Sequence, residues 1–458
     1  MNGTSDTPVD SSPYTFGRAQ DPLPFLGHIW QLWCRPLDFL CSLPEQGDLI
    51  EFRLGLRPAY IACHPDLTLQ ILMDPRTYDK GGPLLDKVRK LLGDGLATSS
   101  FERHLYHRRL LQPVFHISRM PRYTSVICEE IATEVASWTQ GSIVDISKAM
   151  FSTLLRITTR LLFATSLMHD SISEVVECVP IIMHGTYRGM ITPEWWGRLP
   201  TAENRRYNGA QLRLRKIIAR IIGEHRKNGA DQGDMLSVLV SVTDPETGNS
   251  LSDQDIHDQV MTMLIAGTET TGNALAWAFY SLAQHPLVEQ QLYAELDTVL
   301  GGRMPSFDDL PKLTYTGQIF TETLRMYPPG WLFSRLTTRD TKLAGRTLPA
   351  GTSVFYSPYM IGRNPALFKE PEQFAPDRWN PDRAKLIPRG AMIAFGAGNR
   401  KCIGDNLAGA EGPLILATVA SRWRLRLLGG TKPTSMPKLT LETGPLPMMI
   451  ELHQAKAA

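Results

Sequence analysis

The segment from Phe395 to Gly404 holds the residues with the most specific chemistry, because one cysteine stands there among glycines and an arginine. Glycines permit tight turns and let a flat ligand approach the backbone closely. Cys402 comes just before a predicted helix, whose first N–H groups and positive dipole end would lower its pKa and stabilise a thiolate. Arg400 offers a cation for a carboxylate, and Phe395 could shield the sulfur from water. The loop is a candidate thiolate site, with a glycine turn and an incidental cysteine as the alternative.

A second unusual segment, from Ala266 to Thr271, lies in the middle of a long predicted helix. A glycine there costs about 1 kcal/mol relative to alanine, and the threonines can bond back to the backbone and bend the helix. Such local conflicts often mark functional sites. The small residues Ala266 and Gly267 would let a planar cofactor approach, while Glu269 and Thr270 supply an acid and an alcohol for proton transfer. Helix packing alone is the alternative explanation.

The pattern Phe-x-x-Gly-x-Arg-x-Cys-x-Gly is filled at every position, and it resembles the haem-binding signature of the cytochrome P-450 family. The resemblance implies that Cys402 is the axial thiolate ligand of the iron in haem b, and that Arg400 pairs with a haem propionate. A thiolate ligand donates electron density to the iron and favours O–O cleavage. The segment with Glu269 and Thr270 is similar to the family's acid–alcohol motif, although many relatives have aspartate where Glu269 stands.

The same resemblance assigns further residues to the cofactor. His104 and Arg108 look like the family's helix at the haem edge, and Arg335 follows a Pro-Pro turn, so all three are expected to bind propionates. Many relatives have tryptophan where His104 stands, and a surface histidine is the alternative at that position. Phe395, Ala266 and Gly267 are expected to contact the haem.

A helix pair resembling another family feature is formed by Glu322 and Arg325, which stand three apart on one helical face. By itself such a pair is common and is usually solvated. The motif from Pro376 to Trp379 resembles the family's partner segment, so Arg378 is expected to complete a Glu322–Arg325–Arg378 network. We assign this network to folding and haem retention, because losing one member of a buried ion network should cost several kcal/mol.

An apolar pocket is expected by analogy with the family, and such a pocket suits a lipophilic substrate. Its expected lining is Leu84, Leu85, Met263, Ala266, Trp331 and Leu332. Each of these residues could instead simply fill the core. The segments 257–260 and 356–359 resemble bacterial members that oxidise sesquiterpenes and related terpenoids in secondary metabolism. Other lipophilic metabolites and fatty acids are the competing substrates.

The elements that must position these residues are mainly helical. A hairpin is expected from strands at 49–54 and 59–62, and a strand at 352–356. Helical periodicity runs from 103 to 243 with a break at 193–201, and further helices are expected at 252–284, at 314–326 and after Cys402 as far as Ser421. The helix at 252–284 would span roughly 50 Å and can be capped by Ser252 with Asp255. The prediction is a mainly α protein with a small β part and the cytochrome P-450 fold. It places one helical domain at 21–458, after a disordered segment at 1–20.

Composition limits the partners. The formal net charge of +2 gives no sign of nucleic-acid binding. The six cysteines are scattered and form no CxxC, which is typical of reduced cytosolic thiols, and we find neither a signal peptide nor a transmembrane segment. The expectation is a soluble bacterial-type protein, cytoplasmic, monomeric and without a membrane anchor.

Electrons must come from other proteins, because the sequence shows no flavin or iron–sulfur motif. A ferredoxin and its reductase are expected, with Arg103, Arg109 and Lys401 as a basic surface for the acidic partner or as scattered solvated charges. The predicted activity is monooxygenation of a lipophilic molecule by a haem-thiolate enzyme. The alternatives are a peroxide-dependent peroxygenase on the same fold and a non-catalytic haem protein that binds a lipophilic ligand.

Overall fold

The computed structural model describes residues 12–163, 169–192, 194–228, 233–430 and 433–453. The chain divides into two compact units. The first, which we call the strand unit, comprises Met1–Gly82, Leu332–Pro371 and Ile387–Arg400. The second, the helical unit, comprises Pro83–Trp331, Glu372–Leu386 and Lys401–Ala458.

The strand unit is built around a six-stranded sheet with the order β1-β2-β3-β9-β6-β4. Its strands are β1 (Phe16–Arg18), β2 (Leu49–Leu54), β3 (Arg57–Ala62), β4 (Tyr78–Asp79), β6 (Phe333–Thr337) and β9 (Ser353–Tyr356). A separate hairpin pairs β7 (Thr341–Leu343) with β8 (Arg346–Leu348). The helices of this unit are α1 (Ile29–Cys34), α2 (Pro36–Ser42), α3 (Pro65–Met73) and α14 (Pro358–Gly362), with short 3-10 turns at Pro44–Gln46 and Gly398–Arg400.

The predicted hairpin is confirmed, because β2 and β3 pair antiparallel across a turn at Gly55, whose φ is +65°. The predicted strand at 352–356 is confirmed as β9, which pairs parallel with β3 and antiparallel with β6. Phe16–Arg18, which was expected to be disordered, forms β1 and pairs in parallel with β2. Residues 1–11 of that expected segment lie outside the described residues.

The helical unit contains most of the helices. They are α4 (Pro83–Leu92), α5 (Phe101–Leu111), α6 (Met120–Ala136), α7 (Ile146–Phe163), α8 (His169–Ile191), α9 (Ala202–Asn228), α10 (Met235–Ser241), α11 (Asp253–Gln284), α12 (Pro286–Leu300), α13 (Thr314–Met326), α15 (Pro381–Ala384) and α16 (Asp405–Ala420). Its 3-10 turns are at Gln112–Phe115, Ile117–Arg119, Glu194–Arg198, Phe307–Asp309 and Pro376–Trp379. Its strands are β5 (Ile143–Asp145), β10 (Trp423–Leu427), β11 (Met436–Pro437), β12 (Leu441–Glu442) and β13 (Pro447–Leu452).

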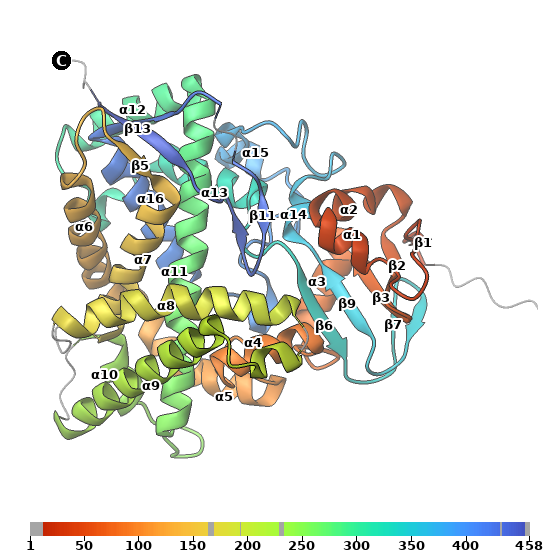
Figure 1. Ribbon diagram of the computed structural model, residues 1–458. Coiled ribbons are helices and arrows are strands. Elements are labelled where there is room, and N and C mark those ends of the chain that lie inside the picture. The colour runs from red at the N-terminus through yellow and green to blue at the C-terminus, as the bar shows by residue number, and fades with distance from the viewer. Residues whose placement is uncertain (1–11, 164–168, 193, 229–232, 431–432, 454–458) are drawn as a thin grey trace, which may run out of the picture. The chain divides into compact units, whose positions relative to one another are not determined.

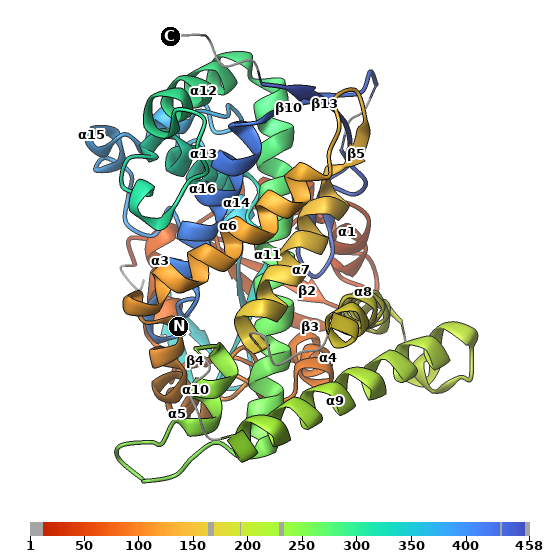
Figure 2. The same cartoon turned by 90° about the vertical axis from the view of Figure 1, so that its left-hand side faces the viewer.

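The helix α11 is the axis of this unit, and α7 packs along it, as both ribbon views show (Figures 1 and 2). Ser252 caps α11, and Asp255 completes the reciprocal capping box, as predicted. Most of its residues are buried, because α7, α13 and α16 all pack against it. This packing fixes the position of α11 in the helical unit and therefore the direction of its side chains.

The other predicted helices are confirmed as well. The structure has α13 at Thr314–Met326 as expected, and α16 follows the cysteine loop with Pro413 in its interior. The break expected at 193–201 contains the 3-10 turn at Glu194–Arg198. Among the described helices, none combines the length and the apolar character that a membrane span needs.

Candidate active site

Cys402 is exposed and stands just before Gly404, which is the N-cap of α16. Arg108 of α5 donates a hydrogen bond to the carbonyl oxygen of Lys401, next to the cysteine. Burial lowers the pKa of the Arg108 guanidinium, and the negative charges of Cys402 and Asp405 act in the opposite direction. The thiol therefore has an arginine within electrostatic reach, as a site that stabilises a thiolate requires.

His104 and Arg108 lie four residues apart on α5, so they share one face of that helix. His104 is buried, which argues against the alternative of a surface histidine. Arg108 is half-buried and bonds the cysteine loop in the structure. Both residues keep their expected role toward a propionate as a prediction.

Two arginines are buried near each other in the strand unit. Arg400 pairs with Asp79 of β4, and Arg335 of β6 donates to the Tyr356 hydroxyl at 3.2 Å and to the Ser334 carbonyl at 2.9 Å. Burial lowers the pKa of Arg400 to about 10; Asp79 opposes this change and the positive charge of Arg335 adds to it. Burying like charges is unfavourable unless anions are close. This donor set therefore fits an anionic group such as a propionate.

The Cys402 loop owes its shape to glycine. Gly398 has a φ of +65°, and a Cβ there would lie 2.4 Å from the carbonyl oxygen of Leu72. Any side chain would therefore both strain the backbone and clash with α3. Phe395, at the start of the same loop, is half-buried in the strand unit. Its role as a shield for the sulfur stays a prediction.

The middle of α11 carries one accessible stripe. Within residues 258–279 the helix is buried except at Met263, Ala266, Gly267 and Thr270. Positions 263, 266 and 270 are three and four apart, so they lie on the same helical face. The Thr270 hydroxyl donates to the Ala266 carbonyl oxygen at 2.6 Å. The stripe is thus apolar except for one alcohol, and Ala266 is its most open residue.

Gly267 lies where α11 packs against a neighbouring helix. A Cβ on Gly267 would lie 3.2 Å from Oγ1 and 3.3 Å from Cγ2 of Thr158, on the neighbouring α7. The missing side chain therefore lets α7 and α11 pack closely, and the expected contact of Gly267 with the haem stays a prediction. Ala266 is exposed, and its expected role of admitting a flat ligand stays a prediction.

Glu269 lies beside Thr270 in sequence but points into the protein. Its Oε1 accepts a hydrogen bond of 2.9 Å from the hydroxyl of Thr440, which follows β11, and Thr440 in turn accepts one of 2.8 Å from Asn273. Burial raises the pKa of Glu269 to about 7, although the Thr440 hydrogen bond acts against this. A carboxyl group with this pKa exchanges its proton near neutral pH, which suits proton delivery.

The three residues of the expected helix network are in contact. Arg325 donates to both oxygens of Glu322 at 2.8 Å, and Arg378 approaches Oε1 at 3.5 Å. Trp379 Nε1 donates to Oε2 at 2.8 Å, and the backbone N–H of Ala375 donates to Oε1 at 3.0 Å. The side chains of Glu322 and Arg325 are both 0% exposed. The buried carboxylate accepts hydrogen bonds from several donors, and its assignment to folding and haem retention stays a prediction.

The expected pocket residues fall in several places. Leu85 on α4 and Met263 on α11 are half-buried, while the side chain of Leu84 lies outside what the structure describes. Trp331 is anchored through Nε1 to the Lys438 carbonyl oxygen at 3.0 Å. Leu332 is half-buried in the strand unit.

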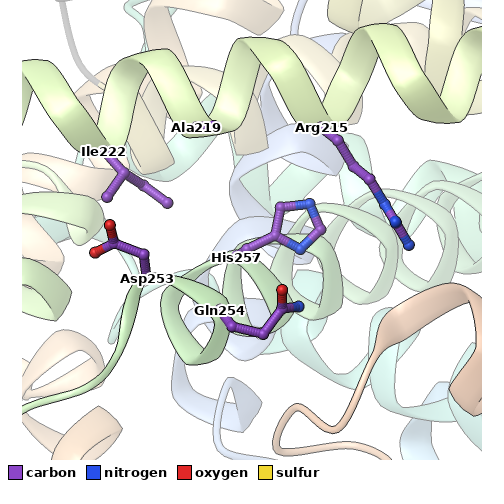
Figure 3. A pocket seen from close by; sticks show the side chains of 6 residues that line it. All are labelled: Arg215, Ala219, Ile222, Asp253, Gln254 and His257. Atoms are coloured by element: carbon purple, nitrogen blue, oxygen red, sulfur yellow. The ribbon is translucent and has the colours of Figure 1, made fainter.

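A cavity of about 270 Å³ lies elsewhere in the helical unit, between α9 and the start of α11 (Figure 3). It is lined by Arg215, Ala219, Ile222, Asp253, Gln254 and His257. None of these belongs to the expected substrate pocket, and their polar character would not suit a hydrocarbon substrate.

The three basic residues expected to attract an acidic electron donor are paired within the chain. The pairs are Arg103 with Asp94 and Asp255, Arg109 with Asp244 and Glu246, and Lys401 with Asp405. Their charges are therefore balanced by neighbouring carboxylates, and the structure does not support an excess of positive charge at these three positions.

Comparison with known proteins identifies the family. A family model described as Cytochrome P-450 matches residues 18–452. The chain belongs to the cytochrome P-450 family. Two relatives come from Streptomyces melanosporofaciens: cyclooctat-9-en-7-ol 5-monooxygenase is 48% identical over 97% of this chain and 98% of its own length, and cyclooctatin synthase is 46% identical over 94% of each. Pentalenene oxygenase of Streptomyces avermitilis is 41% identical over 90% of this chain and 92% of its own length.

The fold is confirmed by a solved relative. The crystal structure of the cytochrome P450DA heme domain matches with a TM-score of 0.85 at 27% identity, over 96% of this chain and 99% of that one. The mainly α class with a small β part and the family predicted from the sequence are therefore both confirmed. In the helical unit, the exposed Cys402 with Arg108 nearby and the accessible stripe at Ala266 have the chemistry that a haem-thiolate group needs. In the strand unit, the buried cations Arg335 and Arg400 have the chemistry that a propionate needs.

Several partners in this cytochrome P-450 were missed by sequence reasoning. Trp379 stands next to Arg378 in a motif that was noticed, so an indole donor beside Glu322 could have been foreseen. Asp79 and Tyr356 pair with arginines that are distant in sequence, and Thr440 follows Glu269 by 171 positions. No local pattern connects these residues, because tertiary folding alone brings them together.

Proposed function

We propose that this cytochrome P-450 is a monooxygenase that hydroxylates, or further oxidises, a terpenoid in secondary metabolism. The single observation that carries the proposal is the accessible stripe of α11, which is apolar apart from the Thr270 hydroxyl. Such a surface binds a hydrocarbon skeleton without leaving polar groups unpaired. The names of the relatives, which include cyclooctat-9-en-7-ol 5-monooxygenase and pentalenene oxygenase, support a terpenoid over a fatty acid.

The cofactor in this proposal is haem b, with Cys402 as the axial thiolate ligand and Arg108, His104, Arg335 and Arg400 as candidates for its propionates. Bound haem would supply the activation of dioxygen and the oxidation of a C–H bond. In the balanced reaction, one oxygen atom enters the substrate and the other leaves as water, with two electrons from a donor protein and two protons. The chain's own residues bind and orient the substrate and deliver those protons.

Glu269 and Thr270 divide the proton transfer between them. Glu269 can hold a proton on its buried carboxyl group near neutral pH, because burial raises its pKa to about 7. Thr270 presents its hydroxyl on the accessible stripe, where it could hold and pass on a proton once its bond to the Ala266 carbonyl oxygen is exchanged. Met263 and Ala266 orient the substrate and keep water away from it.

A ferredoxin with its reductase is the electron donor in this proposal, because the sequence shows no flavin or iron–sulfur motif. We place the enzyme in the cytoplasm as a monomer, and the six free cysteines support a reducing compartment. The acidic partner would have to recognise a surface other than the three self-paired residues Arg103, Arg109 and Lys401.

The test begins with the carbon-monoxide difference spectrum of the reduced, purified holoprotein. A Soret band at the long-wavelength position of thiolate ligation is expected, and Cys402→Ala should abolish it. Titration with cyclooctat-9-en-7-ol should then shift the haem from low to high spin at least tenfold more tightly than a fatty acid of similar size. Turnover with ferredoxin, reductase and isotope-labelled dioxygen should place one labelled atom in the product.

Each alternative has its own result. Fresh, intact protein that lacks the thiolate-type band would contradict the assignment of Cys402. Tight ligand binding with no turnover by any competent redox chain would favour the non-catalytic haem protein. Equally efficient turnover with peroxide alone would favour the peroxygenase, for which the Glu269–Thr270 pair would be unnecessary.

The role of Thr270 has a matched control in Thr268. Both hydroxyls donate to the carbonyl four residues earlier, but Thr268 is buried and Thr270 is accessible. Thr270→Ala should uncouple the enzyme, so that the nicotinamide cofactor is consumed and hydrogen peroxide is released. Thr268→Ala should leave coupling within about twofold of wild type, since its hydroxyl does not reach the stripe. Equal coupling in the two variants would remove the role assigned to Thr270.

A further inference from the structure

The strand unit exposes an unusually apolar surface near its first helix. Four large side chains are more than half exposed: Phe25 at 82%, Leu56 at 72%, Trp33 at 57% and Trp30 at 56%. Together with the exposed Leu26 they form what we call the aromatic face. Single exposed apolar residues need no explanation, but a contiguous group of this size marks an interaction site.

Backbone contacts make the aromatic face continuous. The N–H of Gly55, at the tip of the β2–β3 hairpin, donates to the carbonyl oxygen of Leu26 at 3.1 Å. An isolated bridge pairs Gly27 with Leu54, so the hairpin tip carrying Leu56 lies beside the segment carrying Phe25. Helix α1 follows directly and presents Trp30 and Trp33, three residues apart, on its outer side.

The segment beneath the aromatic face is firmly anchored. His28 is buried, accepts a hydrogen bond at Nδ1 from the Arg53 N–H at 2.9 Å, and lies 3.1 Å from the Gln20 carbonyl at Nε2. A Cβ on Gly27 would lie 2.5 Å from the Arg53 carbonyl oxygen, so only glycine fits there. Phe25 itself adopts a φ of +59°, an unfavourable conformation for a bulky residue. The fold therefore holds these side chains outward at a conformational cost.

The charges around the aromatic face are mainly basic. Arg35 follows α1, Arg53 packs against Gly27 and Arg57 follows Leu56; all three are exposed, and no ion pair is recorded for them in the described part of the chain. Exposed carboxylates at Asp21 and Asp38 reduce the excess of positive charge. Apolar insertion must therefore supply most of any binding at this face, and the arginines would add a preference for anions.

We propose that the aromatic face docks on a lipid bilayer, with a moderate preference for anionic lipid. Tryptophan and arginine are suited to the membrane interface, because an apolar body can insert while a polar group stays in water. Basic residues at the rim are attracted to an anionic leaflet. This peripheral contact goes beyond the proposed monooxygenase function, and it would bring the enzyme to the phase in which a lipophilic substrate accumulates.

The proposal is tested by co-sedimentation of the full-length holoprotein with vesicles. Vesicles of phosphatidylcholine alone and of phosphatidylcholine with a quarter phosphatidylglycerol are compared, and binding should be about threefold stronger to the anionic ones. Trp30→Ser/Trp33→Ser should weaken binding to both at least tenfold. Phe25→Ser/Leu56→Ser is a second, independent pair for which the same loss is expected.

A matched control comes from exposed leucines outside the face. Leu287 is 81% exposed and Leu386 is 82% exposed, so Leu287→Ser/Leu386→Ser removes equally accessible apolar side chains and should bind like wild type. Retention of the thiolate-type carbon-monoxide spectrum shows that each variant is folded. The proposal fails if wild type does not sediment with either vesicle, or if the leucine pair loses as much binding as the tryptophan pair. It also fails if the face instead mediates a dimer, seen as a change in elution volume that Trp30→Ser/Trp33→Ser abolishes while vesicles are not bound.

Discussion

Two buried glutamates in the helical unit have opposite environments. Among the described residues, Glu322 accepts hydrogen bonds from two arginines, an indole and a backbone N–H, whereas Glu269 accepts one, from the Thr440 hydroxyl. Charged donors stabilise the ionised carboxylate, so Glu322 is a structural anion. Burial with a single neutral donor raises the pKa of Glu269 to about 7, so this residue can exchange a proton. The number and charge of the donors therefore decide whether a buried acid holds the fold or delivers protons.

A third buried acid extends the comparison. Glu411 on α16 receives a hydrogen bond from Thr271, and burial raises its pKa to about 8. Like Glu269, it has one neutral donor among the described residues, and Thr271 is buried as Thr440 is. Glu269 differs from Glu411 because the next residue on its helix, Thr270, is accessible. Both differ from Glu322 in charge compensation, since neither accepts a hydrogen bond from an arginine among the described residues.

The largest effect is expected for Glu322→Gln. The substitution leaves the fully buried guanidinium of Arg325 without its counter-charge, and breaking a buried ion pair typically costs about 3–5 kcal/mol. The free energy of unfolding from chemical denaturation should fall by that amount, and the yield of holoprotein should drop sharply. Glu102→Gln, at an exposed position in the first turn of α5, is the control and should change stability by less than about 0.5 kcal/mol. A similar small change at Glu322 would refute its structural role.

The next effect is expected on activity, for Glu269→Gln. Glutamine keeps the shape but cannot release a proton, so coupled product formation should fall by about a hundredfold. Holoprotein yield and the substrate-induced spin shift should stay within about twofold of wild type. The nearby Glu442, which pairs with Lys438 at 2.8 Å, provides the control, because Glu442→Gln should retain most activity. If the glutamine variant of Glu269 loses stability rather than coupling, the two glutamates do not differ as we infer.

Glu411→Gln should change how the free energy of unfolding depends on pH. The pKa of Glu411 is about 8 in the folded protein and about 4.3 when unfolded, so the folded state binds the proton more tightly. Its contribution to stability is full below about pH 4.3 and is lost as pH rises toward 8, at about 1.4 kcal/mol per pH unit. The variant should lack this loss and be more stable than wild type at pH 7, by about 1–3 kcal/mol. Parallel stability curves from pH 5 to pH 8 would contradict the high pKa.

The smallest effect is expected for Thr440→Val, which removes the hydroxyl that donates to Glu269. The Thr440 hydrogen bond lowers the pKa of Glu269, so its loss should raise that pKa. A neutral hydrogen bond is worth about 1 kcal/mol, which corresponds to less than one pH unit. The pH profile of coupled turnover should move upward by that amount while its maximum changes little. Thr443→Val, at a buried threonine whose hydroxyl donates to the Gly444 carbonyl, is the control and should leave the profile in place. If the pH profile of coupled turnover does not shift in Thr440→Val, the pKa of Glu269 does not determine that profile.

The sequence alone determined the elements with strong local signals. The capped helix α11, the helix α13 and the hairpin of β2 and β3 were predicted because periodicity, Ser252 with Asp255, and turn glycines act between near neighbours. The family and the expected role of Cys402 also came from a contiguous motif. Local chemistry of this kind is readable because neighbouring residues interact in every conformation of the chain.

Tertiary structure decided the rest. The sequence could not show that Gly267 packs against Thr158, that Arg103 and Arg109 pair with carboxylates, or that Thr440 bonds Glu269 across 171 positions. Each of these depends on which helix or loop packs against the residue, and a burial-driven pKa depends on how much water that packing removes. The sequence gives the type of each side chain, but its partners and its charge state depend on which distant segments pack against it in the folded protein.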